Sequence, residues 1–479
     1  MPTAPTDAQL ATQYSEAAIE VTNFLAGQQQ RSQGGITWFL ALGDEAGGGR
    51  TLYHGSGGIA LFLVEAFRAT GNEEFLDLAG EAGDEIARYL SGRTGLSVAP
   101  ATGWPGYAFV MAELADAAGT VTETGAADGE RRDNAVWIAR SERFRATARY
   151  SLDQLRAQAS ELGSGIGWIE PMPFSDITGF TGDREIYDQS VGAAGAGCFL
   201  LWAHRRGLHA EALTWAVAVA DRLLEVAERD ETGLRWRLMS DMPFPFTAPN
   251  FAHGGAGVGF FLADLYRETG VQRYLDAAID AARYVQARAL PVGDGMLVCH
   301  TEEVNPPMHY LGMCHGPVGT GRLFVLLTAI TGDPQWVETA HSLIRGLLAT
   351  GAPETRSDGL WNNVGQCCGD AGIGDYATWM SKFTGDPMYL ELAKRCAASL
   401  LSRSIAPEEG MRAWEQAEHR VRPKFVQAQT GYMQGAAGVG SFLLHLAATI
   451  NATGNSTSVK IAFPDMPLLP SGWSAVTAS

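Results

Sequence analysis

Cysteine and histidine side chains gather in a glycine-rich motif that the sequence repeats. The two fullest copies are Met-Cys-His-Gly-Pro-Val-Gly at 313–319 and Gln-Cys-Cys-Gly-Asp-Ala-Gly at 366–372, and each continues into an apolar segment that ends at Thr-Gly-Asp. Six cysteines in 479 residues are too few for a disulfide framework. The dipole of a helix favours thiolates at its N-terminus. Cys314, Cys367 and Cys368 are therefore candidates for metal binding or catalysis.

Charge and composition exclude several classes of partner. The formal net charge is −18, whereas binding to nucleic acid or to an anionic membrane requires clustered lysine and arginine. No run of eighteen apolar residues occurs, so no integral membrane segment is predicted. Residues 1–7 lack the basic and apolar regions of a signal peptide. We therefore expect a cytoplasmic protein that does not bind nucleic acid.

The glycine-rich motif occurs seven times along the chain. The copies begin near residues 54, 102, 191, 253, 313, 366 and 434. Between successive copies lies a second segment with apolar residues at helical spacing, for example 274–289 and 336–348. Because glycine lets backbones approach closely, such motifs suit helix starts that crowd together. Each copy is thus predicted to begin one helix of a pair.

Seven helix pairs predict an all-α chain in the form of a closed α/α toroid. An open solenoid would also satisfy the repeat, but it would tend toward polar terminal units, which the sequence lacks. We expect one domain over 1–479, with its repeat core at about 52–445. Residues 120–132 are predicted to form an exposed insertion, and the tail at 451–479 carries no recognisable chemistry beyond a short extended run at 459–463.

These motifs resemble those of the lanthionine synthetase C-like family. The resemblance rests on the seven glycine-rich helix pairs, the His-Gly of the fourth copy, the Cys-His-Gly of the fifth and the Cys-Cys-Gly of the sixth. It implies a toroid of seven inner and seven outer helices and a zinc-dependent cyclase.

The resemblance also implies a ligand set for one Zn²⁺. The family uses one cysteine of the fifth copy and an adjacent Cys-His pair of the sixth, so the ligands by position are Cys314, Cys367 and Cys368. Cys368 departs from the usual histidine, and a third thiolate would add one negative charge and make a bound substrate thiolate more nucleophilic. Ordinary buried cysteines are the alternative reading, and this is the reading preferred for the cysteines off these positions: Cys198, Cys299 and Cys396.

Three residues match catalytic positions of the family. His253 occupies the His-Gly of the fourth copy, and Asp188 lies four residues before the glycine Gly192 of the third. His315 follows Cys314 where tyrosine is common in the family. Capping or packing is the alternative for each, since aspartate is a favoured cap, and His54 shows that the motif carries a histidine without cysteines nearby. The family's arginine is absent, because Tyr310 stands in its place.

The resemblance implies the addition of a cysteine thiol of a precursor peptide to dehydroalanine or dehydrobutyrine, which forms a (methyl)lanthionine thioether. The substrate would then be a dehydrated peptide. The roughly fifty residues before the first copy are too few for a dehydratase, so a separate dehydratase is expected as a partner.

Other functions remain open. The same zinc site would serve an enzyme that adds glutathione or another small thiol to dehydroamino acids in proteins. A non-catalytic scaffold with structural zinc is a second alternative. A helical toroid that processes glycosides would rely on paired carboxylates and would leave the cysteines unexplained.

Overall fold

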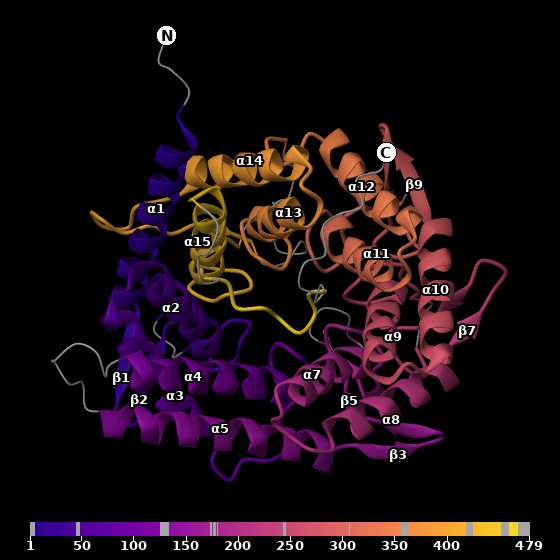
Figure 1. Ribbon diagram of the computed structural model, residues 1–479, viewed down its shortest axis with the longest axis horizontal. Coiled ribbons are helices and arrows are strands. Elements are labelled where there is room, and N and C mark those ends of the chain that lie inside the picture. The colour runs from indigo at the N-terminus through magenta and orange to yellow at the C-terminus, as the bar shows by residue number, and fades with distance from the viewer. Residues whose placement is uncertain are drawn as a thin grey trace. The chain divides into compact units, whose positions relative to one another are not determined.

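The computed structural model describes residues 5–44, 48–124, 134–172, 175, 179, 181–242, 246–305, 307–355, 363–417, 425–451 and 459–467. The chain divides into two compact units. Unit 1 comprises Met1–Arg93, Tyr107–Ser151 and Arg356–Ala462, and unit 2 comprises Thr94–Gly106, Leu152–Thr355 and Phe463–Ser479. Helices dominate both units, as Figure 1 shows. The expectation of a single domain over 1–479 stays a prediction.

Unit 1 is built from pairs of packed helices. In two pairs the second helix begins after a two-residue turn, and in the third pair the two helices are far apart in the sequence. α2 pairs with α3, α13 with α14, and the N-terminal helix α1 with the last helix, α15, beside which it lies in Figure 1. The bounds are α1 (Asp7–Gly27), α2 (Ser56–Thr70), α3 (Glu73–Leu90), α13 (Asp370–Thr384), α14 (Pro387–Arg403), α15 (Ala436–Asn451), β1 (Gln29–Ser32), β2 (Gly35–Trp38), β11 (Glu415–Gln416) and β12 (Gln427–Ala428).

Unit 2 repeats the same pairing three times, with α7 on α8, α9 on α10 and α11 on α12. The bounds are α7 (Ala193–Arg205), α8 (Ala212–Glu225), α9 (Gly255–Thr269), α10 (Gln272–Ala287), α11 (Pro317–Thr331), α12 (Pro334–Ala349), β3 (Ser160–Leu162), β4 (Gly165–Gly167), β5 (Ile169–Pro171), β6 (Asp183–Glu185), β7 (Glu228–Arg229), β8 (Leu234–Arg235), β9 (Ala289–Val292) and β10 (Gly295–Val298). The helix predicted at 274–289 therefore ends two residues early, because Ala289 begins β9.

The remaining pair is α4 (Trp104–Thr124) and α5 (Asn134–Ala157), and the end of α4 overlaps only the first residues of the insertion predicted at 120–132. Residues 120–124 continue the helix, and 125–132 lie outside the described residues. In the tail, residues 459–463 are described and form no strand, contrary to the extended run expected there. No helix in the described part of the chain is long and apolar enough to cross a membrane.

Two glycines in every motif explain why the repeat is rich in glycine. In each motif one of these glycines immediately precedes a helix, and the other follows three positions later. A Cβ atom on either glycine would lie 1.8–2.6 Å from the carbonyl oxygen of the residue six positions before that glycine. In the fourth copy Gly254 meets Ala248 and Gly257 meets Phe251. Any side chain there would collide with backbone. The pairs are Gly55 and Gly58, Gly103 and Gly106, Gly192 and Gly195, Gly254 and Gly257, Gly316 and Gly319, Gly369 and Gly372, and Gly435 and Gly438.

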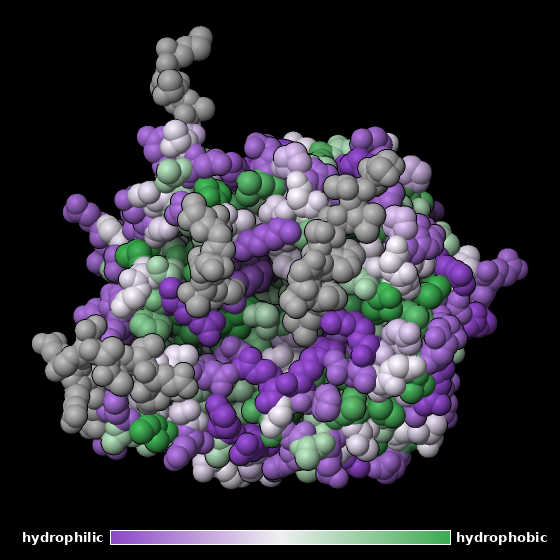
Figure 2. All heavy atoms as spheres, viewed as in Figure 1, coloured by the Kyte–Doolittle hydropathy of each residue, from purple (hydrophilic) through white to green (hydrophobic). Residues whose placement is uncertain are grey.

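Burial distinguishes the two helices of a pair. In α11 every residue from Pro317 to Thr328 is buried, whereas its partner α12 buries one face. A helix that is apolar all round belongs in a core, so the helices that follow the glycine motifs are the inner ones. Polar side chains cover much of the face seen in Figure 2. Large exposed apolar residues include Ile169 and Val271.

The Thr-Gly-Asp tripeptides form the turns within pairs. Gly332 and Gly385 adopt the left-handed conformation, with φ of 70° and 69°, and end α11 and α13. The next residue, Asp333 or Asp386, accepts a hydrogen bond from the second backbone N–H beyond it and caps the outer helix. Glycine after a helix and aspartate before one are the residues that these positions favour.

Short hairpins follow most outer helices, and the sequence analysis did not predict them. Tryptophans within or directly beside these hairpins donate indole N–H bonds of 2.7–2.9 Å to carbonyls in the last turns of the outer helices. The carbonyls near a helix end lack partners within the helix, so these tryptophans complete the helix ends. They are Trp38, Trp168, Trp236 and Trp414.

A buried charge cluster in unit 1 joins inner helices to the tail. His445 on α15 lies 2.9 Å from Glu65 on α2 and 2.7 Å from Asp375 on α13, and Asp375 also pairs with Lys460 at 2.5 Å. Burial alone would lower the pKa of His445, but the charges of Glu65 and Asp375 outweigh it and raise this pKa to about 9. A buried histidinium is thus held between two carboxylates.

This cluster predicts a loss of stability in alkali. The pKa of His445 is raised on folding, so its contribution is complete below the unfolded value of about 6.5 and is lost as pH rises through about 9. We expect the free energy of unfolding to fall by about 3 kcal/mol across this window. Urea unfolding of the wild type and of His445→Gln at several pH values measures it. An equal slope in both proteins would contradict the assignment.

Candidate functional site

Backbone hydrogen bonds join the loops that precede the inner helices of unit 2. Gln189 donates to the carbonyl of Ala252 at 3.1 Å, and Ala252 donates to the carbonyl of Cys314 at 2.8 Å. The third, fourth and fifth glycine motifs are therefore tied together just before α7, α9 and α11. This arrangement sets where Asp188, His253 and Cys314 lie.

Asp188 and His253 form a buried pair. Nδ1 of His253 lies 2.5 Å from Oδ2 of Asp188, and the two side chains are 10% and 1% exposed. The other carboxylate oxygen of Asp188 accepts the backbone N–H of Val191 at 2.8 Å. An ionised carboxylate only accepts hydrogen bonds, so Nδ1 carries the proton, and Nε2 is the ring nitrogen that does not face Asp188. Asp188 thus both caps a turn and orients a histidine.

His315 lies among other rings of unit 2. Its ring centroid is 4.8 Å from that of His253, 4.2 Å from that of His300, which stacks on it, and 5.1 Å from that of Tyr310. His315 is 9% exposed. Tyr310, which stands where the family resemblance predicts an arginine, is therefore in edge contact with His315.

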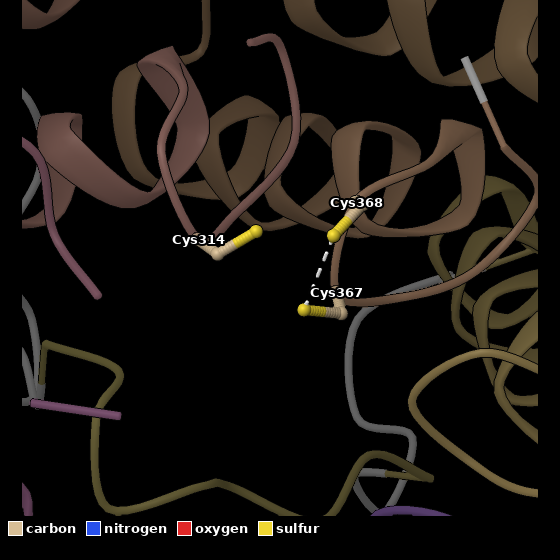
Figure 3. Close-up of side chains that lie close together, drawn as sticks. All are labelled: Cys314, Cys367 and Cys368. Atoms are coloured by element: carbon tan, nitrogen blue, oxygen red, sulfur yellow. Dashed lines mark hydrogen bonds between the residues drawn. The ribbon is translucent and has the colours of Figure 1, made fainter. Parts of the chain in front are cut away.

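In unit 1 the loops of the sixth, seventh and first motifs are joined in the same way. Cys367 donates its backbone N–H to Met433 at 2.9 Å, and Met433 donates to Tyr53 at 3.1 Å. The sulfurs of Cys367 and Cys368 lie 3.4 Å apart, and the dashed line in Figure 3 joins them. Cys367 is 8% exposed and Cys368 is half-buried. Two thiols therefore converge at the start of α13.

An amide network lies beside this cysteine pair. Nε2 of Gln434 is 3.9 Å from the sulfur of Cys368 and 2.9 Å from the hydroxyl of Tyr53. The side-chain oxygen of Gln434 accepts from Nε2 of Gln416 at 3.1 Å and from Nδ2 of Asn363 at 3.3 Å. Gln434 is thereby oriented so that its N–H groups face the sulfur and the phenol.

The donor chemistry of these cysteines fits zinc. With Zn–S bonds of about 2.3 Å, two tetrahedral thiolates lie roughly 3.8 Å apart, close to the 3.4 Å between Cys367 and Cys368. Cys314 of unit 2 stands two residues before Gly316 at the start of α11, as Cys367 stands two residues before Gly369 at the start of α13, and it is 7% exposed. Cys314, Cys367 and Cys368 are three thiols that can serve as metal ligands.

Three site residues were missed in the sequence analysis. Gln434 immediately precedes the glycine of its motif, as His253 and Cys368 do, so an alignment of the seven copies would have singled it out. Asn250 occupies the position of Asp188 in the next copy and likewise accepts a backbone N–H three residues on, at 3.1 Å. His300 belongs to no motif and carries no such signal.

The other thiols fit ordinary core positions. Cys198, Cys299 and Cys396 are all buried. Burial raises the pKa of the Cys198 and Cys299 thiols, which keeps them protonated. His54 of the first motif lies beside Tyr53, with ring centroids 4.4 Å apart.

The family model described as lanthionine synthetase C-like protein matches residues 48–460. The chain belongs to this family. Among solved structures, nisin cyclase is similar at 15% identity, over 83% of this chain and 88% of that one, with a TM-score of 0.50. A sugar epimerase from a ruminal bacterium matches at 13% identity over 91% and 98%, with a TM-score of 0.47, and a D-mannose isomerase matches at 14% over 94% and 99%, with a TM-score of 0.46. The comparison with curated proteins found no match.

The family match and the likeness to nisin cyclase confirm the fold class predicted from the sequence, an all-α chain of the α/α-toroid type. The family resemblance recognised in the glycine motifs is confirmed as well. At 15% identity the likeness to nisin cyclase concerns the fold. The reaction must be argued from the residues of this chain.

Proposed function

We propose that this protein is a zinc-dependent lanthipeptide cyclase. The observation that carries the proposal is the buried Asp188–His253 pair, held by a backbone hydrogen bond to the loop of Cys314. An orientated histidine next to a thiol ligand suits an addition in which protons must be moved. Membership of the lanthionine synthetase C-like family supports the same reaction.

Cys314, Cys367 and Cys368 would hold one Zn²⁺. When bound, zinc would lower the pKa of a cysteine thiol of the substrate and present it as a thiolate. The side-chain amide of Gln434, which would not bind the metal itself, would donate a hydrogen bond to the Cys368 thiolate and stabilise its negative charge.

The residues of unit 2 would handle the proton. A new C–S bond forms at the β-carbon of dehydroalanine or dehydrobutyrine, the C=C π bond breaks, and its electron pair becomes an enolate. Protonated Nε2 of His253, orientated by Asp188, would deliver a proton to the α-carbon. One proton leaves the sulfur and one reaches carbon, so the addition needs no oxidant or net acid. His315 is the alternative donor, because its ring lies beside that of His253.

The substrate would be a dehydrated precursor peptide, and a separate dehydratase would supply it in the cytoplasm. A synthetic peptide with one cysteine and one dehydroalanine tests the reaction. Cyclisation removes the free thiol without a change of mass, which alkylation followed by mass spectrometry detects. Loss of the thiol with enzyme and zinc supports the proposal. Persistence of the thiol, with addition of glutathione to a peptide that lacks cysteine, would instead identify the small-thiol enzyme.

Restoring the usual ligand set predicts slower cyclisation. In Cys368→His a neutral imidazole replaces a thiolate, so zinc should draw more electron density from the substrate sulfur and leave it less nucleophilic. We expect zinc to be retained and the rate to fall on the order of tenfold, about 1.4 kcal/mol. Single-turnover cyclisation by both proteins at matched zinc content measures this. A histidine variant that is as fast as the wild type would refute activation by the third thiolate.

A further inference from the structure

An open cavity of about 680 Å³ lies on unit 1, and the site described above does not use it. Its lining residues come from the β1–β2 turn, the second half of α3 and α5. Its volume is within the range of ligand-binding pockets. Arg88 and Arg143 line it, together with the apolar residues Ala87, Leu90 and Ala146.

The charges around this cavity are unusual for so acidic a chain. Asp84 is shared by Arg140, at 3.1 Å, and by Arg143. Glu85 is shared by Arg50 and Arg88, each at 2.6 Å. Four guanidinium groups thus face two carboxylates. Of these six groups, Asp84, Arg88 and Arg143 line the cavity, so its lining has one positive charge in excess where the whole chain carries −18.

The arginine side chains at the cavity are exposed to solvent, whereas the carboxylate of Glu85 is buried beneath the surface. The Glu85 side chain is 1% exposed, whereas those of Arg88 and Arg143 are 58% and 49% exposed. Burial opposes the ionisation of Glu85, but hydrogen bonds from Arg88 and Arg50 outweigh it and lower its pKa. A guanidinium has five N–H donors, and Arg88 directs only Nε and Nη2 at Glu85. The arginines therefore have donors left for a ligand.

We propose that this cavity binds an acidic peptide segment. Guanidinium groups bind carboxylates through bidentate hydrogen bonds, and the apolar lining residues Ala87, Leu90 and Ala146 suit small side chains between acidic residues. Nucleic acid is disfavoured because the rest of this acidic protein would repel its backbone. The proposal concerns unit 1 alone and does not depend on zinc or on cyclisation.

The test is fluorescence anisotropy of a labelled peptide of alternating glutamate and alanine at low salt. Ala146 is an exposed residue of α5, so Ala146→Glu adds a carboxylate to the cavity without removing any ion pair. Ala146→Gln has nearly the same size and no charge. We expect affinity to fall by about tenfold in the glutamate variant and to stay within about twofold in the glutamine variant. Equal binding by the two variants would overturn the proposal.

Arg88→Ala combined with Arg143→Ala is expected to weaken binding by about tenfold or more. Arg229→Ala combined with Arg283→Ala removes the same charge from exposed positions of unit 2, at 61% and 63% exposure, and should bind as the wild type does. If both double variants lost the same affinity for the peptide, the loss would be a general effect of charge, and the proposal would be wrong. Displacement of the peptide by inorganic phosphate at lower concentration than by free glutamate would assign the cavity to a phosphate ligand instead.

Discussion

Cys367→Ala is expected to abolish thioether formation and to leave the helical content unchanged. The variant removes one proposed zinc ligand, and loss of the metal would forfeit several kcal/mol of transition-state stabilisation, a decrease of about 10³-fold in rate. The backbone bond from residue 367 to Met433 does not involve the side chain and should persist. Single-turnover cyclisation and circular dichroism together measure the effect. Cys314→Ala should behave in the same way.

Cys396→Ala is the matched control, because Cys396 is a fully buried cysteine of α14 outside the glycine motifs. It should keep its zinc and its activity. If Cys367→Ala retained activity, the ligand assignment would be wrong. If chelation of zinc unfolded the wild type, the metal would be structural, because a catalytic ion in a large preformed core is not the sole source of stability.

The second large effect is expected from Asp188→Asn. Asparagine retains an oxygen that can accept the Val191 N–H, so the turn should survive. It cannot hold His253 as a carboxylate does, so proton delivery should slow by about 10²–10³-fold. Zinc content should be unchanged. Full activity in this variant would show that Asp188 serves only as a cap.

Non-additivity gives this prediction a sharper form. His253→Gln and Asp188→Asn disable the same acid–base pair, so the double variant should be about as slow as the slower single variant. A double variant in which the two losses multiply would show that the residues act independently. His315 would then be the better candidate for proton delivery.

The helical repeat could be read from the sequence because its cause is local. Each motif needs glycine where a Cβ atom would meet the carbonyl six residues upstream, as at Gly257 and Phe251. That need recurs with every inner helix and leaves a periodic signal. The Thr-Gly-Asp turns are equally local, since Gly332 ends one helix and Asp333 caps the next.

The hairpins leave a weaker signal. β7 and β8 have two residues each, too few for a periodic pattern. Their geometry depends on packing, such as the bond from Trp236 to the carbonyl of Leu223 in α8. The pairing of α1 with α15 also leaves no local trace, because it joins helices at opposite ends of the chain.

In the candidate site, too, features with a local cause could be predicted from the sequence, and contacts between distant residues could not. The cysteine positions could be predicted because they stand beside the motif glycines. The contact between Asp188 and His253 spans 65 positions, and it depends on backbone hydrogen bonds between loops, such as Gln189 to Ala252. No pattern in the sequence reports such bonds. The stacking of His300 on His315 has the same origin.

X-ray absorption at the zinc edge of the zinc-loaded protein tests the central claim most directly, because it reads the ligand set itself. If Cys314, Cys367 and Cys368 hold one ion, the spectrum will show three sulfur ligands at about 2.3 Å and one oxygen or nitrogen ligand at about 2.0 Å. A first shell with two sulfurs or fewer would contradict the claim that these three thiolates form the catalytic metal site.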